Sequence, residues 1–106
     1  MQKQSVIRMW ITNKNNRKIT EEMSTAMVDF LSIAIEHGCI GSTFAEDDDR
    51  IIVFTKWSDE MTLEVFRSSE DYKMKEVKII QAFVNADFEI PNDILFNSTA
   101  GILFTN

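Results

Sequence analysis

Few side chains in this sequence are able to carry out chemistry by themselves. The chain has one histidine, His37, one cysteine, Cys39, and one tyrosine, Tyr72. One Cys and one His cannot complete a Cys/His zinc site, so we expect no metal ion. Tyr72 is the strongest candidate for binding, because a buried phenol needs a hydrogen-bond partner and can bond to a phenolic substrate. The alternative is a helix residue that packs on a sheet with its hydroxyl at the surface.

Three other polar features have simple structural explanations. His37 stands before Gly38 at the end of an apolar helical stripe, where we expect a helix C-cap and where a cation suits the helix dipole. Cys39 is expected to be an inert buried thiol. The acidic run at residues 46–49 lacks the glycine and the distant glutamate of a calcium loop, which favours a solvated turn.

The composition excludes several classes of protein. A chain of 106 residues is expected to form a single domain, 1–106. Its net charge of −6 argues against nucleic-acid binding, which depends on Lys and Arg. The hydrophobic content of 44% is too high for a disordered chain. Because no apolar run approaches about 20 residues and no signal peptide is recognisable, we expect a cytoplasmic protein with no membrane partner.

Hydrophobic periodicity predicts four strands and two helices along the chain. The expected elements are a strand at 6–12, a helix capped by Thr20 and ending at His37-Gly38, strands at 40–46 and 50–57, a helix capped by Ser58 that restarts at Ser68 and runs to about Gln81, and a strand at 82–90. Pro91 is expected to end the last strand. The tail at 91–106 is apolar, and we expect it to dock on the domain or on a partner chain.

The β-α-β-β-α-β order predicts an α+β, ferredoxin-like fold with an antiparallel four-stranded sheet and both helices on one face. The strand at 50–57 is apolar on both faces, so both faces of the sheet must be covered. We therefore expect a twofold homodimer in which two sheets pack together. Arg8 and Trp10 are expected on this dimer face, with Arg8 paired to Asp87 or Glu89.

Three segments carry a family resemblance: residues 41–44 (GSTF), residues 50–59 (RIIVFTKWSD) and residues 66–73 (FRSSEDYK). A strand that ends in Trp, a helix that contains Phe and a Ser-x-x-(Phe/Tyr)-Lys restart resemble the antibiotic biosynthesis monooxygenase (ABM) family of dimeric α/β barrels. The resemblance covers about residues 5–90, most of the chain.

The resemblance implies roles for three residues. It implies that Trp57 lines the cavity between sheet and helices, beside a flat aromatic substrate; the alternative is a core aromatic at a strand end. It places Tyr72 at the aromatic position of the restarted helix. It also places Asn13 near an Asn that holds substrate or dioxygen in family oxygenases, although Asn13 also fits plain turn chemistry.

The function implied by the resemblance is cofactor-independent monooxygenation of a small aromatic or quinol-type substrate. Trp57, Tyr72 and Asn13 are the expected catalytic residues, and no well-placed general base is recognisable. The alternative is a non-catalytic dimer that binds a small apolar ligand or protects against stress. Haem degradation is disfavoured, because relatives with that activity carry a His shortly after the Ser-x-x-aromatic-Lys motif and this chain has none at residues 74–77.

Overall fold

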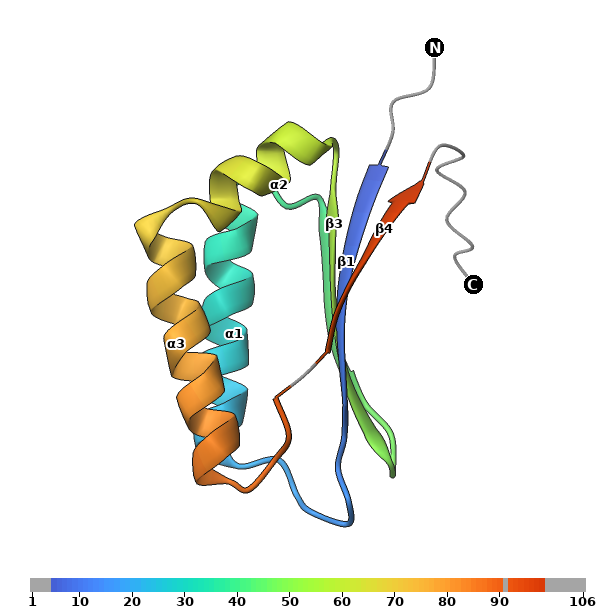
Figure 1. Ribbon diagram of the computed structural model, residues 1–106, viewed down its shortest axis with the longest axis vertical. Helices are drawn as coiled ribbons and strands as arrows, with labels where there is room; N and C mark the ends of the chain where they lie inside the picture. The colour runs from blue at the N-terminus through green and yellow to red at the C-terminus, as the bar shows by residue number, and fades with distance from the viewer. Residues whose placement is uncertain (1–4, 91, 99–106) are drawn as a thin grey trace.

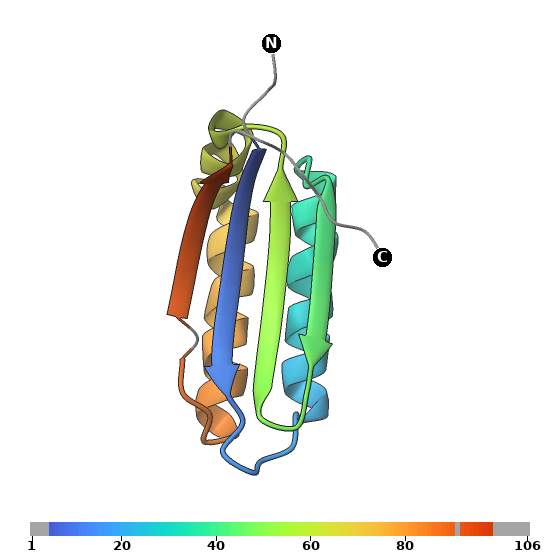
Figure 2. The ribbon, with the colours of Figure 1, turned by 90° about the vertical axis from the view of Figure 1, so that its right-hand side faces the viewer.

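One antiparallel sheet, covered on one face by helices, makes up the protein (Figure 1). The computed structural model describes residues 5–90 and 92–98. Its elements are β1 (Ser5–Asn13), α1 (Glu21–Glu36), β2 (Gly41–Glu46), β3 (Arg50–Trp57), α2 (Glu60–Arg67), α3 (Glu70–Asn85) and β4 (Asn92–Ser98). The strand order is β2-β3-β1-β4, and every neighbouring pair is antiparallel (Figure 2). This is a ferredoxin-like α+β arrangement.

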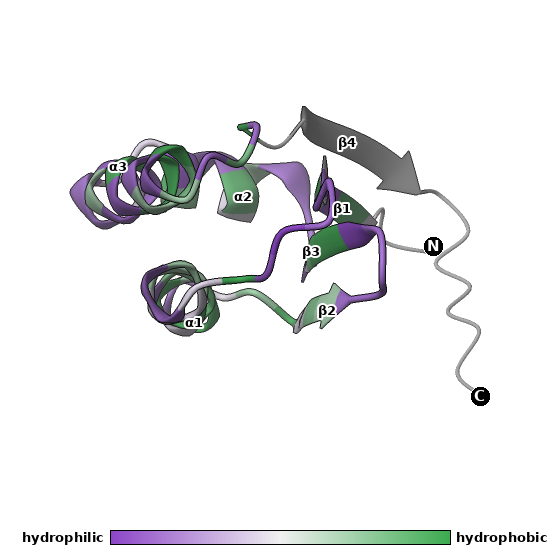
Figure 3. Cartoon of the chain, turned by 90° about the horizontal axis from the view of Figure 1, so that it is seen from below, coloured by the Kyte–Doolittle hydropathy of each residue, from purple (hydrophilic) through white to green (hydrophobic). Residues whose placement is uncertain are grey.

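The two layers are distinct when the molecule is seen along the helices. In Figure 3, α1 and α3 form one layer, and β2, β3 and β1 form the layer beside it. The largest fully buried side chains come from both layers, so the core lies between them. They are Trp57, Phe30, Phe66, Phe83, Met23, Met27, Ile51, Leu63 and Val6.

The first helix forms as its sequence predicts. The Thr20 hydroxyl accepts a hydrogen bond from the Met23 amide at 3.2 Å, which caps the helix. His37 is the C-cap residue, and Gly38 follows with φ of +101°, a conformation that glycine adopts without strain.

The β2–β3 hairpin also follows its sequence pattern. Asp47 Oδ1 accepts hydrogen bonds from the amides of Asp49 at 2.8 Å and Arg50 at 2.7 Å. The bond from the Asp49 amide, followed by those from the Arg50 side chain and the Arg50 amide, lowers the pKa of the Asp47 carboxyl. The bounds of β3 are those predicted, and its side chains alternate between buried and partly buried.

The predicted strand at 82–90 is wrong. The second long helix, α3, runs on to Asn85, and its buried residues Ile79, Ala82 and Phe83 follow helical spacing. The alternating apolar residues of this segment imitate a strand, but packing on the sheet selects the helix. Asp87, at φ of +60°, turns the chain after the helix. The fourth strand lies in the predicted tail, and residues 99–106 lie outside the described residues.

The helix caps differ by one residue from those predicted. Asp59, not Ser58, caps α2 by accepting from the Thr62 amide at 2.8 Å. Ser69, not Ser68, caps α3 by accepting from the Tyr72 amide at 3.2 Å. In each case two neighbouring residues can serve as caps, and the turn geometry selects the second.

The faces of β1 are the reverse of those predicted. Val6, Arg8, Trp10 and Thr12 are buried against the helices. The side chains of Ile7, Met9 and Ile11 are partly exposed on the opposite face. The purely apolar side of the strand is therefore not the helix side, because the rings of Trp10 and Tyr72 on the helix side accommodate the Arg8 guanidinium.

Candidate active site

Five aromatic rings pack together between the sheet and the helices. Phe30 of α1 lies 4.7 Å from Trp10 and 5.8 Å from Tyr72, measured between ring centroids. Phe66 of α2 stacks on Trp57 at 5.1 Å and meets Tyr72 edge-on at 5.2 Å. We call Trp10, Phe30, Trp57, Phe66 and Tyr72 the aromatic cluster. Trp57 and Tyr72 thus belong to one site, with Phe66 between them.

A chain of hydrogen bonds joins β1 to α3 at the edge of the aromatic cluster. Arg8 Nη2 donates to the Tyr72 hydroxyl at 2.5 Å, and that hydroxyl donates to Glu76 Oε2 at 2.6 Å. Arg8 and Tyr72 are each only 6% exposed, and Glu76 is partly buried. Arg8, Tyr72 and Glu76 together are called the polar triad below.

The phenol of Tyr72 is held in its neutral form. Burial, followed by the hydrogen bond to Glu76, raises the pKa of Tyr72, and the charge of Arg8 opposes this rise only in part. At neutral pH the hydroxyl therefore keeps its proton. Because it has only one proton to donate, and Glu76 accepts it, Tyr72 offers an acceptor lone pair rather than a donor to an incoming molecule.

Arg8 lies among aromatic rings rather than at a sheet-to-sheet interface. Its guanidinium carbon is 5.0 Å from the centroid of Trp10 and 5.1 Å from that of Tyr72, a cation–π arrangement. The expected ion pair with Asp87 or Glu89 is wrong, because these residues follow α3 and are exposed, whereas Arg8 points to the helix side.

Trp57 forms the end wall of the aromatic cluster and is fully buried. Its indole N–H donates to Thr55 Oγ1 at 3.0 Å, so this donor is already satisfied by the protein. The Trp57 ring stacks on Phe66 and does not line the gap beside Arg8.

Asn13 lies away from Trp57 and Tyr72. It is exposed at the end of β1 and pairs with Arg50, whereas Trp57 pairs with Val6 near the start of the same strand. Seven residues of strand separate the two positions, roughly 23 Å at about 3.3 Å per residue. The structure therefore brings two of the three predicted site residues together and leaves Asn13 apart.

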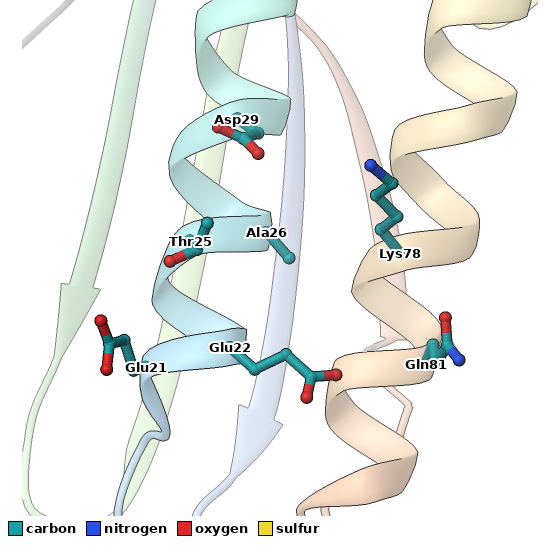
Figure 4. A pocket seen from close by; sticks show the side chains of 7 residues that line it. All are labelled: Glu21, Glu22, Thr25, Ala26, Asp29, Lys78 and Gln81. Carbon is teal, nitrogen blue, oxygen red and sulfur yellow. The ribbon is translucent and has the colours of Figure 1, made fainter.

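The interior beside the polar triad is tightly filled. The gap that is lined by Arg8, Trp10, Phe30, Val53 and Thr55 has no space for a water molecule. A wider groove of about 550 Å³ lies between α1 and α3, where Lys78 projects toward α1 (Figure 4). Its lining residues are Glu21, Glu22, Thr25, Ala26, Asp29, Lys78 and Gln81. This groove shares no residue with the polar triad or the aromatic cluster.

His37 and Cys39 have structural contacts outside the polar triad. The His37 ring lies 5.1 Å from that of Phe66, and its Nε2 is 3.2 Å from Asp71 Oδ2. Cys39 is buried, and its thiol donates to the Gly41 carbonyl at 3.0 Å. Among the described residues, no group of three or more His, Cys, Asp or Glu side chains is arranged to hold a metal ion.

Sequence analysis missed the roles of Arg8 and Glu76. Glu76 follows Tyr72 by four residues, the spacing at which two side chains meet on a helix. This spacing in the sequence indicates a contact between the two side chains. Arg8 alternates with Val6 and Trp10, but the strand pattern does not indicate which face meets the helices. Fold and site together define a ferredoxin-like α+β protein with a polar triad at the edge of a buried aromatic cluster.

Solved structures with the same fold include proteins of the ABM type. SnoaB, a cofactor-independent oxygenase from Streptomyces nogalater, matches with a TM-score of 0.68 at 9% identity, over 89% of this chain and 91% of SnoaB. A Caulobacter crescentus protein, provisionally described as an antibiotic biosynthesis monooxygenase, matches with a TM-score of 0.68 at 12% identity, over 92% of each chain. A conserved Bacteroides thetaiotaomicron protein matches with a TM-score of 0.64 at 13% identity, over 92% of this chain and 99% of its own.

These matches confirm the resemblance to ABM proteins at the level of the fold. No family model and no curated protein sequence matches the chain. In the part of the chain that the structure describes, no helix is long and apolar enough to span a membrane. Cytoplasmic location stays a prediction from the sequence.

Proposed function

We propose that this protein is a cofactor-independent monooxygenase of a small aromatic or quinol-type substrate. The observation that carries the proposal is the polar triad, in which Arg8 and Tyr72 are buried among aromatic rings, on a fold shared with a cofactor-independent oxygenase. Rings can bind a flat substrate, and the triad provides a cation and a proton acceptor next to it.

The chemistry assigned to the site takes its electrons from the substrate. A phenol or enol loses a proton, the resulting carbanion reacts with dioxygen, one oxygen atom enters the substrate and the other leaves as water. Arg8 stabilises the negative charge that develops, and the buried surroundings strengthen this attraction. Trp57 contributes a wall, and Tyr72 contacts the reacting hydroxyl. Asn13 lies too far along β1 to share this role.

The test is dioxygen uptake with a panel of hydroquinones and polycyclic phenols. Wild type is expected to consume dioxygen, and Tyr72→Phe and Trp57→Ala are expected to lose most of this activity. Gly41→Ala, which adds only an ordinary contact on the far strand, is the control. An inactive wild type across the panel would end the proposal.

A second candidate is a non-catalytic protein that binds a small apolar ligand. The tightly filled interior disfavours a large substrate more than a small ligand, because the gap beside Arg8 has no space for a water molecule and either molecule enters only if the rings move. Native mass spectrometry of freshly purified protein separates the two candidates. A co-purified ligand without dioxygen uptake supports binding alone.

Haem degradation does not fit the residues of this site. The one histidine, His37, is engaged by Asp71 and packs on Phe66, and it makes no contact with the polar triad that the structure records. Addition of haemin is therefore expected to leave its Soret band unshifted.

We also propose that the protein is a homodimer formed through the open face of the sheet. Ile7, Met9 and Ile11 of β1 and Ile52 and Phe54 of β3 are partly exposed on the face that no helix covers. An apolar surface of this kind is stabilised when a second sheet removes it from water. Sedimentation at micromolar concentration is expected to give twice the chain mass of 12.3 kDa, and a monomer would refute the dimer.

A further inference from the structure

We propose that Glu76 is the proton acceptor of this site and that Tyr72 relays the substrate proton to it. The inference rests on the proposed function, since it requires a substrate with an acidic hydroxyl. It supplies the general base that the sequence does not reveal, and it defines the substrate as one that binds as a phenol or enol and reacts as its anion.

The direction of the hydrogen bonds supports the relay. Arg8 can only donate, so the Tyr72 oxygen accepts from Arg8 Nη2 and its one proton lies toward Glu76 Oε2, 2.6 Å away. The second lone pair of the Tyr72 oxygen is suited to accept a hydrogen bond from a substrate hydroxyl. A bond of 2.6 Å to a carboxylate is short and charge-assisted, as expected where a proton can move.

The charges around Tyr72 favour the transfer. Among the described residues, the charged groups that face its hydroxyl are Arg8 from β1 and Glu76 from α3 itself. The neighbouring helices α1 and α2 contribute the rings of Phe30 and Phe66. The cation of Arg8 stabilises the anion that the substrate becomes, and Glu76 receives the proton.

Tyr72 and Glu76 differ in exposure, and each exposure suits one end of the relay. Tyr72 is 6% exposed and reaches the interior, whereas Glu76 is only partly buried, so a proton on its carboxyl can pass to water. Proton exit thus requires no opening of the aromatic cluster.

The proton step is balanced in atoms and charge. The O–H bond of the substrate breaks, and its proton forms a new bond to the Tyr72 oxygen. The proton first carried by Tyr72 moves to Glu76 Oε2, the substrate keeps its electron pair as a phenolate or enolate, and Tyr72 ends as the neutral phenol that it was. No electron is transferred in this step.

The test uses 4-nitrophenol, whose phenolate absorbs visible light and whose neutral form does not. Equilibrium dialysis measures binding, and the visible spectrum measures the ionised fraction of the bound probe as a function of pH. Glu76→Gln keeps an oxygen that accepts from Tyr72 but has no basic carboxylate. Glu36→Gln, at an exposed position at the end of α1, makes the same charge change elsewhere and is the control.

Wild type and Glu36→Gln are expected to bind the probe with the same ionisation midpoint and to consume dioxygen at the same rate. Glu76→Gln is expected to bind the probe with a lower ionisation midpoint, because the lost carboxylate charge opposes ionisation of a nearby phenol. Glu76→Gln and Tyr72→Phe are both expected to slow dioxygen uptake roughly a hundredfold, because the proton acceptor or its relay is removed. Bound probe that ionises identically in wild type and Glu76→Gln would overturn the relay and leave the proposed function standing. A wild type that binds no phenol would overturn both.

Discussion

The Tyr72 hydroxyl donates to Glu76 one turn further along α3 and accepts from Arg8, which lies 64 residues earlier on β1. One phenol thereby connects α3 to β1, one of the two central strands of the sheet. Its position makes Tyr72 a structural residue as well as a candidate functional one, and both roles can be measured separately.

Replacement of Tyr72 by Phe is expected to lower the free energy of unfolding by about 1–3 kcal/mol. The ring and its contacts remain, but Arg8 and Glu76 each lose a buried hydrogen bond. Urea unfolding followed by circular dichroism measures the change. An unaltered midpoint would show that the polar triad does not contribute to stability.

The alkaline titration of Tyr72 is expected to reflect its surroundings. Because Tyr72 is the one tyrosine in the chain, tyrosinate absorbance reports this residue alone. Its pKa should exceed the ordinary 10.0, and Glu76→Gln should lower it, since burial and Glu76 both raise the pKa. A Glu76→Gln value equal to or above that of wild type would contradict this account.

The same pKa shift predicts how stability depends on pH. The folded state holds the Tyr72 proton more tightly than the unfolded state, so unfolding becomes easier as pH rises above 10.0 toward the raised pKa. Below pH 10.0 this contribution is fully present. Chemical unfolding across this range should show the decline in wild type and a smaller decline in Tyr72→Phe.

Replacement of Phe54 by Lys is expected to convert the proposed dimer to a monomer. The change places a charge on the partly exposed apolar face of β3. Val77→Lys, at a position of α3 that is 62% exposed, is the matched control and should leave the mass unchanged. Equal sedimentation of wild type and Phe54→Lys would argue for another interface.

Gly38→Ala is expected to destabilise the protein by about 1–2 kcal/mol, because a left-handed backbone disfavours a side chain. The added Cβ would also lie 3.1 Å from Thr62 Cγ2, at the junction of α1 and α2. Gly41→Ala is the control, since its nearest contact of 3.8 Å is ordinary. Thermal unfolding of the two variants should therefore differ.

Local sequence patterns determined much of the fold. The stripe of α1, the acidic turn at residues 46–49 and the apolar run of β3 each specify an element through contacts within a few residues, and all three formed where predicted. A cap, a turn or a periodicity is complete within its own segment, so no distant partner is needed to recognise it.

The end of α3 shows where this reasoning fails. Apolar and polar residues alternate over residues 84–90, which favours a strand, but residues 82–85 also fit a helix, and only packing against the rest of the core selects the helix. Once α3 takes these residues, the fourth strand must come from the following segment, where Asn92–Ser98 pairs with β1.

The sequence by itself determined the types of the elements up to about residue 81, and its family resemblance placed Trp57 and Tyr72 in one candidate site. Only the tertiary structure decided which face of β1 meets the helices, and so brought Arg8 beneath Tyr72. The physical reason is that alternation along a strand divides the side chains between two faces but does not indicate which face packs on the helices. Which face packs on the helices depends on the side chains that the helices place against the sheet. Here α3 places the Tyr72 phenol against β1, where Arg8 donates a hydrogen bond to it.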